Sequence, residues 1–244
     1  MKRTKKRILT IGGVIISILL LSILGFYFKI KSEMKEMNVI ETKQIAKNIF
    51  AVNNSFVNMF LVKDSDFYVA IDAGNDKEMV TIELKKLNIN PDKVVAVMLT
   101  HTDGDHTAAL QLFKNAKIYL ARQEEQMING TTSKFLFIGN KLSCKNYNLL
   151  DNQQIINVGN LKIKGILTPG HTPGSICYLI NDKYLFVGDA FGLKNGKLSN
   201  PNELFSMDMK TGIQSMAKIK HLLKAEYIFT AHNEYSDNYK IAVK

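Results

Sequence analysis

Three apolar runs of this chain end directly on a histidine or an aspartate, and this pattern constrains the fold more than any other feature. The run "KVVAVMLT" (93–100) leads into "HTDGDH" (101–106), "YLFVGD" ends at Asp189, and "YIFTAH" ends at His232. A continuous apolar run is typical of a strand covered on both faces. Loops at the ends of such strands hold side chains in a common cleft on a rigid sheet. The pattern therefore predicts buried strands whose ends bring imidazole and carboxylate groups together.

The rest of the body alternates predicted strands with predicted helices. Strands are expected at residues 48–54, 57–63, 66–74, 93–100, 117–121, 175–181, 183–190 and 226–232, with a hairpin at 154–168 that turns at Gly159-Asn160. Helices are expected at 76–88 with Asn75 or Asp76 as the cap, at the start of 106–115, and at 208–223. Early strands, a hairpin-rich middle and a final helix and strand together predict two sheets with helices outside them.

The formal net charge of +10 raises the question of a nucleic-acid partner, but the distribution of the charge argues against one. Residues 1–36 carry eight of the 32 Lys and Arg residues and two of the 22 acidic residues, which leaves 24 basic and 20 acidic residues in the rest of the chain. That body carries a net charge of only +4, and its lysines are scattered as on an ordinary solvated surface. No nucleic-acid partner is expected.

The basic residues at the N-terminus precede an uncharged stretch. Residues 8–28 contain no charge, and a helix of that length is about 31 Å long, close to the hydrocarbon core of a bilayer. The sequence predicts a cytoplasmic basic tail (1–7), a transmembrane signal-anchor helix (8–28), a polar stalk (29–43) and a folded domain (44–244). The positive charges before the span place the folded domain on the outer side of the cell membrane, anchored by a single pass. A cleaved signal peptide is the alternative, although its apolar region is usually shorter.

The chain has two cysteines, Cys144 and Cys177. Two cysteines are too few to indicate a disulfide framework, although a domain outside the cytoplasm could pair them. Neither has the spacing of a metal knuckle. The interpretation favoured here is a pair of free, buried thiols.

Seven side chains of metal-ligand type stand at or near the ends of the predicted apolar elements. Four share one loop, one lies between two Pro-Gly turns in "TPGHTPGS", and two end strands: His101, Asp103, Asp105, His106, His171, Asp189 and His232. Neutral imidazole and carboxylate groups bind zinc, iron and manganese. The alternative for the loop is a helix cap, in which Asp103 or Asp105 starts the helix near His106. The fifth histidine, His221 in "KIKHLLK", is interpreted as a surface residue.

The order of these motifs resembles that of the metallo-β-lactamase-fold hydrolases. The resemblance rests on "HTDGDH", "PGHTPGS", "VGDA" and "TAH", supported by "VNMFLV" and "AIDAG" nearer the N-terminus, and it covers roughly residues 45–240. Four motifs in one order form a specific signal, whereas any one alone would be weak. The resemblance implies an α/β fold, an αββα sandwich with the metal cleft at one edge of the two sheets.

The resemblance also implies two metal positions. The first would be held by His101, Asp103 and His171, the second by Asp105, His106 and His232, and both by a bridging Asp189. The implied cofactors are two divalent metal ions, first of all zinc, with manganese or iron as alternatives. Asp72 is expected to orient these ligands, unless it only starts a turn before Gly74.

One position departs from the family pattern. Asp103 stands where the family usually has a second histidine. A carboxylate there makes the first position harder and more anionic, which favours manganese or iron over zinc or leaves a single metal bound. Alternate residues of an extended loop point the same way, so Asp103 is expected to face the cleft with His101 and Asp105 rather than to cap a helix.

The resemblance implies hydrolysis by a metal-bound hydroxide. Two cations roughly 3.5–4 Å apart would deprotonate a water near neutral pH. Asp105 and Asp189 are the expected catalytic residues, and Asp105 would also shuttle the proton. The partner would be a small-molecule substrate: an ester, lactone, thioester, phosphodiester or β-lactam, with Asn233 and Tyr235 as candidates to contact it. The alternatives are an iron-dependent redox enzyme on the same scaffold and a catalytically inactive metal- or ligand-binding protein.

Overall fold

The predicted strands form two large sheets in the computed structural model, which describes residues 2–134, 139–144, 146–221 and 224–244. The first sheet runs in chain order through β1 (Lys43–Ala46), β2 (Ile49–Asn54), β3 (Val57–Asp64), β4 (Phe67–Ile71), β5 (Val94–Met98), β6 (Lys117–Ala121) and β7 (Asn148–Leu150). The second has the order β15 (Tyr235–Ser236), β14 (Tyr227–Phe229), β11 (Tyr184–Phe186), β10 (Ile176–Ile180), β9 (Leu161–Leu167) and β8 (Ile155–Val158). The smaller elements are the hairpin β12 (Gly192–Lys194) and β13 (Lys197–Ser199), the short helix α4 (Glu125–Ile128), and 3₁₀ turns at Pro91–Lys93, Leu110–Leu112 and Arg122–Glu124.

Strand direction determines which loops gather at one edge. Strands β4 to β7 are parallel, so the loops that follow β4, β5 and β6 leave the same edge of the first sheet. These loops begin near residues 72, 99 and 122. In the second sheet β11 and β14 are parallel, and the loops after them begin near residues 187 and 230. Every predicted strand-end ligand therefore follows the carboxyl end of a parallel strand.

The core lies between the two sheets, with a further apolar layer outside each of them. Successive side chains of a strand point to opposite faces. In β3, Phe60 and Val62 face the second sheet, whereas Met59 and Leu61 face the layer outside the first. Both faces are thus covered, which explains why these strands are nearly continuous apolar runs.

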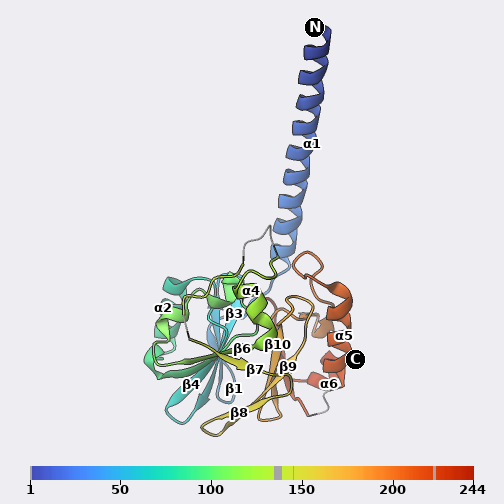
Figure 1. Cartoon of the computed structure of the whole chain (residues 1–244). Coiled ribbons are helices and arrows are strands. Elements are labelled where there is room, and N and C mark those ends of the chain that lie inside the picture. Colours follow the sequence, from blue (N-terminus) through green and yellow to red (C-terminus); the bar gives the residue numbers. More distant parts are fainter. Residues whose placement is uncertain (1, 135–138, 145, 222–223) are drawn as a thin grey trace. The chain divides into compact units, whose positions relative to one another are not determined.

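Helices cover the outer faces. Val80 and Leu84 of α2 (Lys77–Lys86) pack on the outer face of the first sheet. Ile219 of α5 (Met209–Lys220) and Tyr239 of α6 (Tyr239–Ala242) pack on the outer face of the second. Figure 1 shows α2 on one side of the paired sheets and α5 and α6 on the other. The layers confirm the predicted αββα sandwich.

Aspartate caps begin the two longer helices of the sandwich. Oδ1 of Asp76 accepts a hydrogen bond from the backbone N–H of Met79 at 2.7 Å, and Asp208 caps α5 by accepting from Thr211 at 3.0 Å. The cap at Asp76 is one of the two predicted. The predicted α5 extended to 223, but the described helix ends at Lys220, and residues 222–223 lie outside the described residues.

The helix predicted to begin near His106 is much shorter than expected. It forms a single turn, α3 (Gly104–Thr107), followed by the 3₁₀ turn at Leu110–Leu112. The backbone N–H groups of Ala108 and Ala109 donate to the carbonyls of Gly74 and Ala73 instead of to carbonyls within a helix. The helix stops early because the loop after β4 accepts the hydrogen bonds that would have extended it.

The N-terminal segment and the sandwich form separate compact units, 1–37 and 38–244. Helix α1 (Lys2–Lys35) is continuous across the predicted span of 8–28. Its segment Ile11–Lys35 has a mean hydropathy of 2.4 and is long and apolar enough to cross a membrane, a property it shares with signal sequences.

The polar stalk was predicted to reach residue 43, but the folded unit begins earlier. Ile40 is buried in the core between the sheets, and its backbone N–H donates to Oδ1 of Asn58 at 2.8 Å. The apolar Ile40 within an otherwise polar segment accounts for the difference.

The two cysteines are free, as predicted. Cys177 is fully buried in β10, and this burial raises the pKa of its thiol to about 12. Cys144 is half-buried, and burial also raises the pKa of its thiol.

Candidate metal centre

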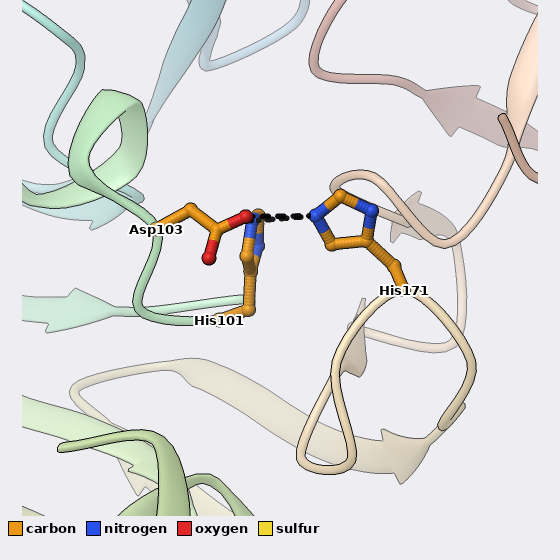
Figure 2. A group of neighbouring side chains, drawn as sticks. All are labelled: His101, Asp103 and His171. Atoms are coloured by element: carbon orange, nitrogen blue, oxygen red, sulfur yellow. Dashed lines mark hydrogen bonds and ion pairs between the residues drawn. The ribbon is translucent and has the colours of Figure 1, made fainter. Parts of the chain in front are cut away.

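The structure brings the three side chains of the first predicted metal position together. Nε2 of His171 lies 3.2 Å from Nε2 of His101 and 3.1 Å from Oδ2 of Asp103, and the latter two atoms are 3.4 Å apart. Figure 2 shows the three side chains facing one another from two loops. His101 and His171 are buried, and the side chain of Asp103 is 18% exposed.

The three side chains of the second predicted position also converge. Oδ2 of Asp105 lies 3.6 Å from Nε2 of His106 and 3.5 Å from Nε2 of His232. One ligand-type atom from each lies within 4.8 Å of the others, which is the spacing that a shared metal ion requires.

Asp189 lies between the two groups. Its Oδ1 is 3.3 Å from Nε2 of His106 and 3.1 Å from Nε2 of His232, and its Oδ2 is 3.4 Å from Nε2 of His171. All seven predicted side chains thus meet in one place, and Asp189 stands where a bridging ligand would stand.

Asp103 does not cap α3. Its backbone is at the N-cap position, but its side chain makes no capping hydrogen bond and turns toward His101 and His171 instead. The helix-cap interpretation of this residue is therefore wrong.

Asp72 orients two histidines by accepting three hydrogen bonds. Its donors are the backbone N–H of Thr100 at 2.7 Å, the hydroxyl of Thr100 at 2.8 Å and Nδ1 of His106 at 2.9 Å. Because the Thr100 hydroxyl proton is used here, its oxygen accepts from Nδ1 of His101, 3.1 Å away. Both imidazoles therefore present Nε2 to the centre. Asp72 has a φ of 61°, a left-handed conformation that few non-glycine residues adopt.

The second group, which consists of Asp105, His106 and His232 with the adjoining Asp189, contains buried polar atoms without partners. Nδ1 of His232 donates to the carbonyl of Phe56 at 2.7 Å, which turns Nε2 toward the centre. Among the described residues, Nε2 of His106 and Oδ1 of Asp189 have no hydrogen-bond partner. A buried acceptor left unpaired is costly, so the donor set fits a divalent cation at this point.

The electrostatics of the second group favour a cation. Burial disfavours charge, but the imidazoles of His232 and His106 outweigh it and hold the pKa of Asp189 well below its usual range. Burial also opposes a charged His106, yet Asp105, Asp189 and Asp72 raise its pKa well above the usual range. The acids thus attract positive charge to this position, either as a proton or as a metal ion.

Glu124, which the sequence did not single out, joins the two ligand loops. It is fully buried. Its Oε1 accepts from the backbone N–H and hydroxyl of Thr102, both at 2.8 Å, and its Oε2 accepts from the hydroxyl of Thr172 at 2.7 Å and the N–H of Gly174 at 3.1 Å. A Cβ at position 174 would lie 2.2 Å from the backbone nitrogen of Glu124, so only glycine permits this approach. The available sequence signal was an acid shortly after the strand predicted at 117–121.

Helix α5 holds the His171 loop from the other side. A Cβ at Gly170 would lie 2.4 Å from Cα of Gly212, so the loop and the helix touch backbone to backbone. The hydroxyl of Ser215 donates to the carbonyl of Pro169 at 2.8 Å. Glycine and serine on the buried face of α5 thereby fix His171.

Two further polar residues that sequence reasoning missed contact Asp103. Nζ of Lys134 donates to Oδ2 of Asp103 and lies 2.7 Å from Nε2 of His171. Nδ2 of Asn140 donates to Oδ1 of Asp103 and to the hydroxyl of Thr102, both at 3.0 Å. No local pattern marks either residue.

Three further residues that the sequence singled out make scaffold contacts or lie at the surface. The ring of Tyr235 stacks on Phe229 in the core, and its hydroxyl donates to the carbonyl of Ile45, so its side chain is part of the scaffold rather than a substrate contact. The backbone carbonyl of Asn233 accepts from Nδ2 of Asn58 at 2.8 Å. His221 is exposed at the end of α5, as predicted.

A family model described as the metallo-beta-lactamase superfamily matches residues 52–232, which include all seven side chains. The chain belongs to the metallo-beta-lactamase superfamily. As a superfamily member it carries the expected order of ligand motifs, with Asp103 as the departure described above.

Curated relatives agree with this assignment. A probable metallo-hydrolase of Methanocaldococcus jannaschii is 32% identical over 158 residues, which cover 64% of this chain and 66% of the relative. A probable polyketide biosynthesis zinc-dependent hydrolase of Bacillus velezensis is 31% identical over 124 residues, covering 50% and 48%. The chain thus spans about half to two thirds of the length of these relatives.

Solved structures share the superfamily fold. A subclass B3 metallo-beta-lactamase isolated from a soil metagenome library superposes with a TM-score of 0.63 over 80% of each chain, at 15% identity. At that identity the likeness concerns the fold alone.

Proposed function

We propose that this chain is a metal-dependent hydrolase whose metal lies among Asp105, His106, Asp189 and His232. The observation that carries the proposal is a pair of buried atoms, Nε2 of His106 and Oδ1 of Asp189, which are 3.3 Å apart and lack hydrogen-bond partners among the described residues. One divalent cation between them would satisfy both atoms. His101, Asp103 and His171 form the other candidate metal position.

A bound divalent metal supplies Lewis-acid chemistry: it lowers the pKa of a water and polarises a substrate oxygen. The residues of the chain orient the ligands and transfer the proton. Asp72 and the carbonyl of Phe56 fix the imidazoles of His106 and His232. Asp105, whose side chain is 23% exposed, is the carboxylate best placed to pass a proton between the centre and solvent.

We propose zinc as the metal. The proposed substrate is a small ester, lactone, thioester, phosphodiester or β-lactam. The zinc-dependent relative supports the metal, and the superfamily supports hydrolysis. The polar side chains of the centre, of which Asp103 and Asp105 are 18% and 23% exposed, suit a substrate with a polarisable carbonyl or phosphoryl oxygen.

The decisive test uses full-length protein purified in detergent without added metal. Metal analysis should find zinc, and a panel of ester, thioester, phosphodiester and β-lactam substrates should reveal hydrolysis that a chelator reduces to background and zinc restores. Chelator saturated with zinc beforehand serves as the control. Hydrolysis that is indifferent to the chelator would contradict the proposal. Bound iron with an oxidised product would favour redox chemistry, and bound metal without turnover would favour a binding protein.

We also infer that α1 anchors the protein in the cell membrane with the hydrolase domain outside. The support is the length and hydropathy of Ile11–Lys35 and the basic residues before it. Protease added to intact cells should remove the domain and leave an N-terminal fragment in the membrane fraction, while a cytoplasmic marker stays intact. A domain that resists protease until lysis would refute the orientation. A mature protein that lacks its first residues would indicate a signal peptide instead.

A further inference from the structure

The ammonium group of Lys134 contacts two of the three predicted ligands of the first metal position. Nζ of Lys134 donates to Oδ2 of Asp103 and lies 2.7 Å from Nε2 of His171. Its side chain is only 11% exposed. These two acceptor atoms are the ones that the first metal would use, together with Nε2 of His101.

The ammonium and a metal ion compete for the same electrons. A neutral imidazole has a single lone pair on its unprotonated nitrogen. Nε2 of His171 can accept a hydrogen bond from Nζ of Lys134 or coordinate a metal, but not both. Two cations held on the same pair of atoms would also repel each other at short range.

The lysine accounts for the departure of Asp103 from the family pattern. A histidine at position 103 would offer Lys134 no negative charge, whereas a carboxylate offers an ion pair. Asn140 satisfies the other carboxylate oxygen at 3.0 Å, so Asp103 is fully held without a metal. The second group lacks such a set of partners: among the described residues, Nε2 of His106 and Oδ1 of Asp189 have no hydrogen-bond partner.

Resting on the proposed function, we propose that the ammonium of Lys134 takes the place of the first metal ion, so that the protein holds one divalent metal, in the second group. His101, Asp103 and His171 then serve chiefly as the receptor for this internal cation. The ammonium also places a fixed positive charge 2.7 Å from Nε2 of His171, an atom that in turn lies 3.4 Å from Oδ2 of Asp189.

The test counts metal ions in full-length protein incubated with excess zinc and then freed of unbound metal. Wild type should hold about one zinc per chain, and Lys134→Met about two, because the lone pair of His171 becomes available to a metal. Adding Asp103→Ala to Lys134→Met should return the count to about one. Lys141→Met, which removes an exposed lysine near Asn140, should leave it at one. Lys134→Gln is measured in parallel, because it keeps a polar group against Asp103 if the methionine variant is unstable.

The outcomes separate the two proposals. Two zinc ions in both wild type and the Lys134 variants would overturn the inference about Lys134 and leave the metal-dependent hydrolase intact. One zinc ion in both would likewise overturn it, because Lys134 would then not be what excludes the second metal. No zinc in any of the proteins would overturn the proposed function and, with it, the inference. A rise from one to two that Asp103→Ala reverses would establish the inference.

Discussion

Replacing His232 with alanine is expected to remove the bound metal and lower hydrolysis by more than about 100-fold, because loss of an outer hydrogen-bond partner alone typically costs about 10- to 100-fold. His232 places Nε2 within 3.1 Å of Asp189 and 3.5 Å of Asp105, at the centre of the second group. Its side chain is 15% exposed and less enclosed than His106, so the variant should remain folded. Metal content and the initial rate on the best substrate of the panel provide the measurement.

The matched control for this variant is His221→Ala. His221 is exposed at the end of α5 and is the histidine that lies outside the centre. The same substitution there should leave both metal content and rate within a factor of two or so, as expected for a surface residue. A His232→Ala protein with full metal content would show that the second group is not the metal site.

Replacing Glu124 with glutamine is expected to destabilise the protein by about 2 to 4 kcal/mol, because an amide donor would replace a carboxylate oxygen that accepts two hydrogen bonds in a buried site. Glu124 accepts four hydrogen bonds from the loops that carry His101 and His171. For a domain of this size the change should lower the melting temperature by roughly 5 to 15 °C.

Glu125→Gln is the control for Glu124, since it makes the same chemical change at the next residue. Glu125 is partly exposed, and among the described residues its carboxylate accepts a single hydrogen bond, from Tyr147 at 3.2 Å. Its substitution should change stability by no more than about 0.5 kcal/mol. Equal melting temperatures for the two variants would contradict the role of Glu124 as the link between the loops.

The strands and the ligands that end them were predictable because each signal is local. The alternation within β3 and the apolar runs before His101, Asp189 and His232 lie within a few residues of the features they predict. The shortened α3 was not predictable from its own sequence. Its hydrogen bonds are taken by the backbone of Ala73 and Gly74, more than thirty residues earlier.

The residues that sequence reasoning missed act only through distant partners. Glu124 meets Thr172 and Gly174 about fifty residues along the chain, in a segment that looks like an ordinary charged turn. Lys134 meets Asp103 and His171, thirty-one and thirty-seven residues away. A lysine carries no sign of burial in its own neighbourhood, so its position depends on the assembled fold.

The ligands come from both sheets, so the complete site forms only after both sheets have folded. Asp105 and His106 follow a strand of the first sheet, whereas Asp189 and His232 follow strands of the second. Neither half of the chain contains the whole metal-binding set, so the site comes into being only when the sheets have docked. Metal binding is therefore expected late in folding: a chain whose sheets have not docked holds only part of the ligand set, and a bound ion then stabilises the docked sheets against separation.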